Sequence, residues 1–234
     1  MEVFRRNCKR IYTSPLGSVF ATSALLWALT SFGSCQQTAS PNCDKTQTLI
    51  PFEDTTLVCG WGFKDEQGQV VIPPQYCAVF QEAFVDRIAC VVDARQKTAA
   101  GRDRLIAIDK CNNFVLEPFT FDNGPDYVRE GVFRFWKDGK IGFADKDGHT
   151  VIPAQFDFAG PFDQGMTGFC IGCKPQAFDE YVEWRGGKWG FIDNKGNVVI
   201  PAVYDMAQPF KGGFSMVSQN GQQFYINKKG QKIE

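Results

Sequence analysis

The sequence predicts an all-β protein made of tandem antiparallel β-meander and hairpin repeats that stack as a solenoid-like or curved array. Three observations support this prediction. A phrase of an apolar strand, an acidic turn with glycine, a second apolar strand and a proline recurs along the chain. Glycine-containing pairs stand where hairpins would turn, and the segment before one such pair alternates apolar and polar residues. The phrase is clearest at residues 188–201, and it recurs at residues 60–73 and 140–153.

The unit that begins at residue 133 illustrates the first two elements. Phe133 to Lys137 alternates apolar and polar residues, as a half-buried strand should. Asp138-Gly139 follows and predicts a two-residue hairpin, because a type I′ turn needs positive φ at both central positions. Gly186-Gly187 and Asn220-Gly221 occupy the same place in later units, so we expect hairpin turns there as well.

The remaining elements of that unit follow the same logic. Lys140–Ala144 forms a second strand, which turns through residues 146–148 into a third strand at Thr150–Ile152. We expect Pro153 to stop this third strand, since proline cannot donate to a ladder. Weaker copies at residues 104–118 and 223–233 complete a series of about five units. Each turn is preceded by a side chain that can cap it, namely Asp65, Asp109, Asp145, Asp193 or Asn227.

The full motif reads Trp-Gly-Phe-Ile-Asp-x-x-Gly-x-Val-Val-Ile-Pro, and an aromatic-Asp pair and Pro-Phe follow it at residues 202–210 and 154–162. It resembles the bacterial WG-repeat (KWG-repeat) family. The resemblance covers roughly residues 44–234, with Cys77 replacing the aspartate after Tyr76. It implies a set of β-rich repeat modules whose theme is binding. It implies no common activity and no catalytic residues that can be carried over.

The first 34 residues resemble a bacterial lipoprotein signal peptide. Arg5, Arg6, Lys9 and Arg10 make a basic start, and residues 19–29 form an apolar run too short for a comfortable bilayer span. Small residues then lead to Cys35, which the resemblance implies is the lipidated first residue after cleavage. An uncleaved anchor, or a plain secretory signal cut near Ser34, are the alternatives.

We therefore expect a signal peptide at residues 1–34, a polar tether at 35–43 and a β domain at 44–234. The net charge is −1, and no basic stripe remains after the signal is removed, which argues against nucleic acid as a partner. No later apolar stretch could span a membrane, so contact with the membrane would be through the lipid alone. Gln36 follows Cys35 where an aspartate would favour the inner membrane, so we expect an outer-membrane protein facing the periplasm. A secreted or periplasmic protein is the alternative.

One repeat position is apolar in every unit. Its members are Trp61, Leu105, Ile141, Trp189 and Phe224. A stacked aromatic platform for a ligand is one interpretation. The tolerance of leucine and isoleucine favours core instead, where burying each side chain contributes about 1.5–3 kcal/mol. The next residue is Gly62, Gly142 or Gly190, which we expect where a backbone or ring packs too closely for a Cβ. The prolines that close the phrase, Pro73, Pro153 and Pro201, are also assigned a structural role.

Cysteine usage predicts disulfides. The cysteines after Cys35 are Cys43, Cys59, Cys77, Cys90, Cys111, Cys170 and Cys173. In an oxidising envelope this number predicts disulfide pairs with one thiol left over. From proximity along the chain, we expect Cys43 to pair with Cys59, and a second pair to form among Cys77, Cys90 and Cys111.

The Cys170-x-x-Cys173 motif is the one candidate for redox catalysis. Thioredoxin-like enzymes place such a motif at the start of a helix after a strand. Here Gly165 and Gly168 precede it and Lys174-Pro175 follows it within a β-repeat, so that helix is not expected. A structural disulfide or a plain pair of loop cysteines is the favoured interpretation. No second ligand pair with zinc spacing is present.

No other residue pattern indicates catalysis or a cofactor. His149 is the only histidine, and it follows a turn glycine where other units have glutamine or asparagine, which is typical of an exposed strand start. Schemes that need a histidine base or histidine metal ligands would rest on this residue alone. Periodic turn aspartates do not indicate a carboxylate pair for glycoside hydrolysis. We therefore expect no metal and no cofactor.

The sequence thus predicts a non-enzymatic envelope lipoprotein that acts as a binding or scaffolding module for an envelope protein or glycan. The variable connections at Ala78–Gly101, Thr120–Glu130 and Asp163–Tyr181 would present its contact surface. An envelope thiol-disulfide protein using Cys170 and Cys173 is one alternative. The other is a carbohydrate-binding module with exposed aromatic residues on one face, and the candidates for it are Tyr127, Tyr181 and Trp184.

Overall fold

The computed structural model describes residues 44–80, 87–98, 101–178 and 181–233. The chain divides into two compact units, Met1–Gln36 and Gln37–Glu234, and every described residue belongs to the second. The predicted signal peptide and tether, with Cys35 and Cys43, lie outside the described residues. All regular structure in these ranges is β-strand, which confirms the predicted all-β class. The solenoid-like or curved stacking stays a prediction. Within the same ranges, no helix has the length and apolar character needed to cross a membrane.

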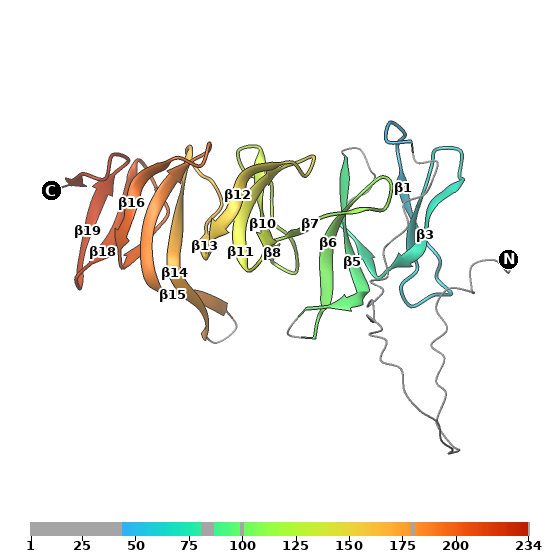
Figure 1. Ribbon diagram of the computed structural model, residues 1–234, viewed down its shortest axis with the longest axis horizontal. Coiled ribbons are helices and arrows are strands. Elements are labelled where there is room, and N and C mark those ends of the chain that lie inside the picture. Colours follow the sequence, from blue (N-terminus) through green and yellow to red (C-terminus); the bar gives the residue numbers. More distant parts are fainter. Residues whose placement is uncertain (1–43, 81–86, 99–100, 179–180, 234) are drawn as a thin grey trace, which may run out of the picture. The chain divides into compact units, whose positions relative to one another are not determined.

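Antiparallel strands in the described ranges form five repeat units (Figure 1). The first unit comprises β1 (Ile50–Glu53), β2 (Trp61–Lys64), β3 (Val70–Tyr76) and β4 (Ala78–Val79). The second comprises β5 (Ile88–Lys97), β6 (Asp103–Asp109) and β7 (Phe114–Pro118), followed by the small hairpin β8 (Thr120–Phe121) and β9 (Gly124–Pro125). The third comprises β10 (Val132–Lys137), β11 (Lys140–Asp145), β12 (Thr150–Phe156) and β13 (Phe158–Ala159). The fourth comprises β14 (Met166–Phe178), β15 (Tyr181–Asp193), β16 (Val198–Tyr204) and β17 (Met206–Ala207). The fifth comprises β18 (Phe214–Gln219), β19 (Gln222–Asn227) and β20 (Lys232–Ile233).

The first, third and fourth units pair their second and third strands in one register. The recurring opposed pairs are Phe63 with Ile72, Phe143 with Ile152, and Phe191 with Ile200. A β-bulge then shifts the register, so that Trp189 faces Tyr204. A Cβ at Gly190 would lie 2.5 Å from the carbonyl oxygen of Ile200 and 2.8 Å from the carbonyl carbon of Pro201. The backbone of the opposite strand is therefore what requires glycine here.

The expectation that proline stops the third strand is wrong. Pro73, Pro153 and Pro201 lie inside β3, β12 and β16, which continue to the aromatic residues Tyr76, Phe156 and Tyr204. Each of these strands is at an edge of its sheet and is bulged at the proline. At a bulge in an edge strand, the N–H that proline lacks is not needed to pair with an acceptor of the ladder. The strand can therefore continue through the proline.

The predicted turn caps are present in all five units with one geometry. In the fourth unit, the Asp193 carboxylate accepts hydrogen bonds from the backbone N–H groups of Lys195 and Asn197 at 2.9 and 2.8 Å. The equivalent pairs of bonds are made by Asp65, Asp109, Asp145 and Asn227. These side chains satisfy backbone donors inside the turn, so their periodic recurrence is structural.

Neighbouring units are joined by strands and by shared cores. The short strands β4, β13 and β17 each pair with the first strand of the next unit, and β7 pairs directly with β10, which extends one sheet to seven strands. A Cβ on the turn glycine Gly196 would lie 3.1 Å from Ile152 of the preceding unit. Buried residues of two successive units, such as Ile152 and Phe169, belong to the same cluster. Each unit therefore completes its core only with its neighbour.

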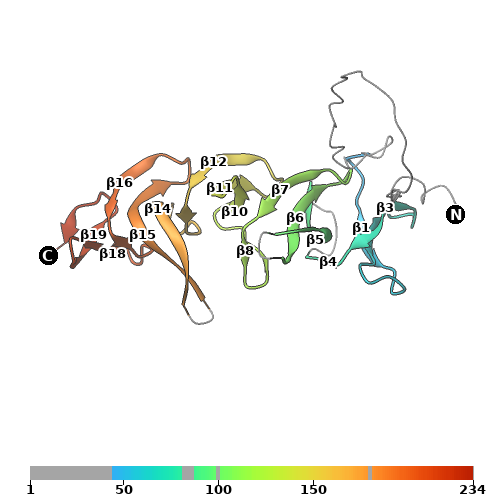
Figure 2. The same cartoon turned by 60° about the horizontal axis from the view of Figure 1, so that its bottom comes forward.

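The hairpin turn expected at Gly186-Gly187 is not there. β14 and β15 continue past this point to Phe178 and Tyr181, and they form the longest hairpin of the described chain (Figure 2). Gly186 and Gly187 have positive φ, as does Gly172, yet they face β14 in an unchanged antiparallel register, with Gly186 opposite Cys173. Positive φ was thus indicated correctly, but the two strands continue in register through these glycines, and the chain does not reverse there. The expected turns at Asp138-Gly139 and Asn220-Gly221 are present, with positive φ at all four residues.

Two of the expected variable loops are largely strand. Ala78–Gly101 contains β4 and the long strand β5, and Asp163–Tyr181 contains β14. Thr120–Glu130 contains the β8–β9 hairpin. Chain-specific structure between units is therefore carried by extended hairpins as much as by loops.

The disulfide pairing expected from proximity is wrong. Cys59 is bonded to Cys77, Cys170 to Cys173, and Cys111 is also disulfide-bonded. Cys90 is a free, buried thiol, and burial raises its pKa to about 12. Strand pairing overrides proximity in sequence, because β2 and β3 bring the residues that flank them, Cys59 and Cys77, together.

Candidate functional site

A row of aromatic rings crosses the third and fourth units, and we call it the aromatic row. Its members are Phe119, Trp136, Phe158 and Trp184, all partly buried. Phe119 stacks on Trp136 with ring centroids 5.5 Å apart, and Trp136 lies 6.2 Å from Trp184. Trp184 in turn stacks on Phe158 at 5.1 Å. The four rings thus form one continuous partly exposed surface.

The aromatic row is specific to this part of the repeat array. The residues that take the place of Trp136 in the strand register of other units are Val92, Cys170 and Ser218. The residues that take the place of Phe158 are Ala78, Glu117 and Met206. Trp184 lies on the part of the β14–β15 hairpin that extends beyond the turn position of the third and fifth units. A scaffold role would recur from unit to unit, so these rings indicate a local role.

A buried ion pair, Arg134 with Asp126, contacts the aromatic row at Phe119. Arg134 is buried, and its guanidinium lies 4.1 Å from the ring centroid of Phe119. It donates to both carboxylate oxygens of Asp126 at 2.8 and 2.7 Å and to the carbonyl oxygen of Ala159 at 3.2 Å. The predicted alternation of β10 is therefore only half right. Phe133 and Phe135 are buried on one face as expected, but Arg134 is buried on the other because its charge is paired there.

A groove of about 660 Å³ begins at Trp136. Its other walls come from β6, β7 and the turns that flank β11, and they include Phe114, Lys137 and Thr150. Arg104 and Glu117 form an ion pair in the groove with their side chains about one quarter exposed. The groove therefore combines an aromatic face with charges of both signs, a combination suited to orienting a polar ligand over an apolar contact.

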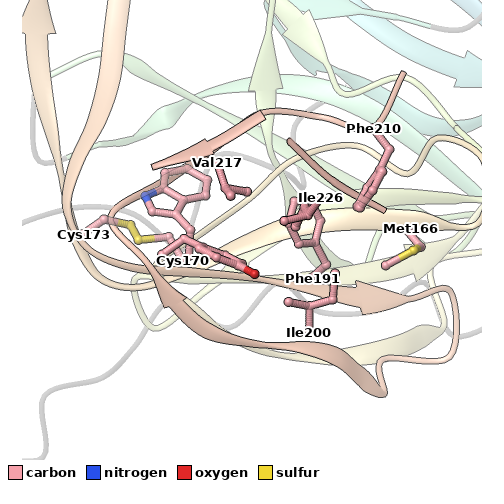
Figure 3. Packing of buried hydrophobic residues seen from close by; sticks show 10 residues of the cluster. Met166, Cys170, Cys173, Phe191, Ile200, Phe210, Val217 and Ile226 are labelled. Carbon is pink, nitrogen blue, oxygen red and sulfur yellow. A yellow bond between two sulfur atoms is a disulfide. The ribbon is translucent and has the colours of Figure 1, made fainter. Parts of the chain in front are cut away.

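The Cys170–Cys173 pair is part of the core (Figure 3). Cys170 is 0% and Cys173 4% exposed, and they pack with Trp189, Tyr204 and other buried residues of the fourth and fifth units. Both lie within β14, so no helix N-terminus faces either sulfur. Reactive thiols need access and thiolate stabilisation. This surrounding favours the structural interpretation of the pair.

Asp145, Asp147 and His149 form a cluster whose ligand atoms lie within 4.8 Å of one another. His149 is exposed, as expected, and its Nδ1 lies 3.2 Å from the Asp145 carboxylate. In the fourth unit, Asn197 makes the equivalent contact with Asp193. A polar residue that pairs with the turn carboxylate is thus a feature of the repeat, and the cluster indicates no metal site by itself.

The other residues singled out from the sequence divide into core and surface. Ile141 and Trp189 are buried, whereas Trp61 and Leu105 are partly buried against core clusters. The assignment of Phe224 to the same repeat position is wrong, because the strand register places the exposed Gln223 there and Phe224 one residue later. Tyr127 is exposed and packs edge-on against Phe121, and no ring contact in the described residues joins it to Trp184. The side chain of Tyr181 lies outside the described residues.

Sequence reasoning missed Phe119, Trp136 and Phe158, together with the Arg134–Asp126 pair. A signal for Trp136 was present, because aligning the units places it at a position where other units have valine, cysteine or serine. The signal for Phe119 and Phe158 was weaker, since both lie in connections whose lengths differ between units.

The fold and the site define an all-β tandem-repeat protein with a chain-specific aromatic surface. A family model described as "WG containing repeat" matches residues 61–81, 141–172 and 189–222. These three regions of the chain are therefore WG repeats, as the sequence motif indicated. Comparisons with curated proteins and with solved structures gave no match.

Proposed function

We propose that this protein is a non-enzymatic binding module of the bacterial cell envelope, which holds an envelope partner through the aromatic row and the adjoining groove. The observation that carries the proposal is the aromatic row itself. Four partly exposed rings are in continuous contact, and two of them, Trp136 and Phe158, stand at positions that other units fill with small, polar or aliphatic residues. Partly exposed tryptophan beside a polar groove is a typical composition of an interaction surface.

Two features support a location outside the cytoplasm. The basic start, apolar run and small residues before Cys35 have the order of a lipoprotein signal. The described residues include the disulfides Cys59–Cys77 and Cys170–Cys173, and disulfides persist in oxidising compartments. We propose attachment to the outer membrane through lipidated Cys35, with the repeat domain in the periplasm.

The experiment is crosslinking of the native protein in intact cells, followed by purification and mass spectrometry. The variant W136A/W184A removes two rings of the aromatic row, and V182A is its matched control because Val182 is an exposed residue on the same strand as Trp184. We expect wild type and V182A to capture the same partner and W136A/W184A to lose it. Equal capture by all three proteins, with unfolding transitions unchanged, would refute the proposal.

A glycan is the second candidate partner, and the stacked geometry of the aromatic row favours it. Ring faces can lie against the apolar faces of sugar rings, and Arg104 and Glu117 can hydrogen-bond hydroxyl groups. Sedimentation with isolated peptidoglycan and with soluble polysaccharide would test it. Binding that W136A/W184A abolishes would identify a carbohydrate-binding module, whereas no binding to either material leaves the protein partner as the candidate.

A further inference from the structure

A second cavity is lined mostly by residues of the fourth unit and of the segments that connect it to its neighbours, and it shares no lining residue with the groove. Its volume is about 380 Å³, and its lining includes both Gly160 and Gly168, so we call it the double-glycine pocket. Gly160 N–H donates to the carbonyl oxygen of Gly168 at 3.0 Å. This bond joins the segment after β13 to β14.

The same backbone bond recurs in other units with larger residues on both sides. The equivalent donor and acceptor residues are Phe80 and Cys90, Phe119 and Arg134, and Gln208 and Met216. In the third unit, the side chains of Phe119 and Arg134 stack in this place at 4.1 Å. In the double-glycine pocket, Gly160 and Gly168 leave both sides of the bond without a side chain. A Cβ at Gly160 would lie 3.1 Å from Thr167 Oγ1, whereas one at Gly168 would make only an ordinary contact at 3.7 Å, so the space for a larger group is on the Gly168 side.

The walls of the double-glycine pocket are mostly aromatic and firmly held. Phe162, Phe191 and Phe210 are 1%, 0% and 3% exposed and pack in pairs, with ring centroids of Phe191 and Phe210 4.7 Å apart. Trp189 and Phe158 close another side. The volume is in the range of small-molecule sites, about 300–1,000 Å³, and a rigid aromatic lining is typical of them.

Charged residues of opposite sign stand among these apolar walls. Arg129 and Asp163 are both exposed and both line the pocket. They occupy equivalent places at the entry to β10 and β14, since each donates its N–H to the residue that begins the strand. A ligand whose ring enters the pocket would thus meet one cation and one anion at its head.

We propose that the double-glycine pocket is a binding site for a small aromatic compound with a zwitterionic head, such as an aromatic amino acid. The ring of the compound would fill the space beside Gly168, its carboxylate would face Arg129 and its ammonium group would face Asp163. The pocket shares Phe158 with the aromatic row, but Trp136, Trp184 and the groove are not part of it, so W136A/W184A tests the partner surface separately.

The test is isothermal titration calorimetry of the full chain with L-phenylalanine, and with benzyl alcohol as a probe that has the ring without the charges. The variant G168M places in the pocket the residue that the fifth unit has at this position. A Cβ at Gly168 would meet Phe191 at 3.7 Å, an ordinary contact, so the variant should fold. The control V198M adds the same side chain at an exposed place on β16.

We expect L-phenylalanine to bind wild type and V198M equally and G168M at least tenfold more weakly. D163N and R129Q should weaken binding of L-phenylalanine and leave binding of benzyl alcohol unchanged. Equal binding of L-phenylalanine to G168M and wild type would overturn the proposal. So would the absence of binding by wild type at about 10 mM L-phenylalanine, which corresponds to less than about 3 kcal/mol of binding free energy.

Discussion

At the scale of single residues, the same residue type performs opposite tasks in this chain. Gly190 is needed because the opposite backbone stands where a side chain would be, whereas Gly168 leaves a space that a side chain could fill. Both lie in strands of the fourth unit. Substituting each in turn therefore tests whether glycine is sterically required at that position or could be replaced by a larger residue.

We expect Gly190→Ala to destabilise the protein by at least about 2 kcal/mol, because the added Cβ would lie 2.5 Å from the carbonyl oxygen of Ile200 and the bulged backbone would have to move. Gly168→Ala should be neutral or stabilising by up to about 1 kcal/mol, since alanine is favoured over glycine in a strand. Urea unfolding of the two variants measures both values. A smaller loss for Gly190→Ala than for Gly168→Ala would contradict the assignment of these glycines.

The aspartate after the aromatic residue of the third and fourth units links each unit to the next. Bonds from Lys188 and from the backbone N–H of Asn220 lower the pKa of Asp205. Burial acts to raise the pKa of Asp157, but bonds from Lys140 and from the N–H of Gly172 outweigh it and lower that pKa as well. Both carboxylates thus pair with a lysine of their own unit and accept a backbone hydrogen bond from the following unit, Asp205 at the Asn220 turn and Asp157 within β14.

A lowered pKa in the folded state means that these aspartates stabilise the protein above their unfolded pKa of about 4. That stabilisation is lost as the pH falls through the folded pKa. We therefore expect wild type to lose stability on acidification from about pH 5 to pH 2 and D157N/D205N to lose less over this range. Thermal unfolding across the pH series compares them. Parallel curves for the two proteins would show that these pairs contribute no pH dependence.

At the scale of elements, the first unit replaces that ionic link by a covalent one. Cys77 follows Tyr76 as Asp157 follows Phe156 and Asp205 follows Tyr204. Where the aspartates pair with Lys140 and Lys188, Cys77 is bonded to Cys59. The bridge spans 18 residues of sequence and closes β2 and β3 into a loop.

Cys59→Ser with Cys77→Ser should lower the free energy of unfolding by roughly 3 kcal/mol, because a closed loop of this length restricts the unfolded chain. Guanidinium unfolding with and without dithiothreitol provides the measurement. We expect the reductant to lower the stability of wild type more than that of the variant. An equal effect on both proteins would mean that the Cys59–Cys77 bridge is not a source of stability.

The elements also show which parts of the fold a single sequence can predict. Strand identity, the Asp138-Gly139 hairpin and the turn caps depend on local residues, and the structure has them. The bulge at Pro201, the strand continuation past Gly186 and the burial of Arg134 depend on what lies opposite in space. The aromatic row belongs to this second group, because Phe119 and Trp184 are brought together through Trp136 only when two units pack.

At the scale of the whole molecule, the proposed binding role depends on where in the cell the protein is located as much as on its surface. Each core cluster unites residues of successive units, so the repeat domain needs no anchor to complete its core. A lipid on Cys35 would instead fix the domain to one membrane, and a polar segment such as residues 36–43 would let it reach a partner nearby.

We therefore expect the mature protein to begin at a lipid-modified Cys35 and to fractionate with the outer membrane. A single acyl chain gives only marginal membrane binding, so stable anchoring requires the several chains of a lipoprotein modification. Mass spectrometry of the N-terminal peptide and partition into detergent would test this, with Cys35→Ser as the variant and Cys90→Ser as a control at a cysteine of the fold. Retention of Cys35→Ser in the membrane fraction after signal cleavage would contradict lipid anchoring. Because binding to the partner is expected to depend on Trp136 and Trp184 and not on Cys35, purified Cys35→Ser should still bind the partner in solution. That result would show that membrane anchoring and partner binding depend on different residues.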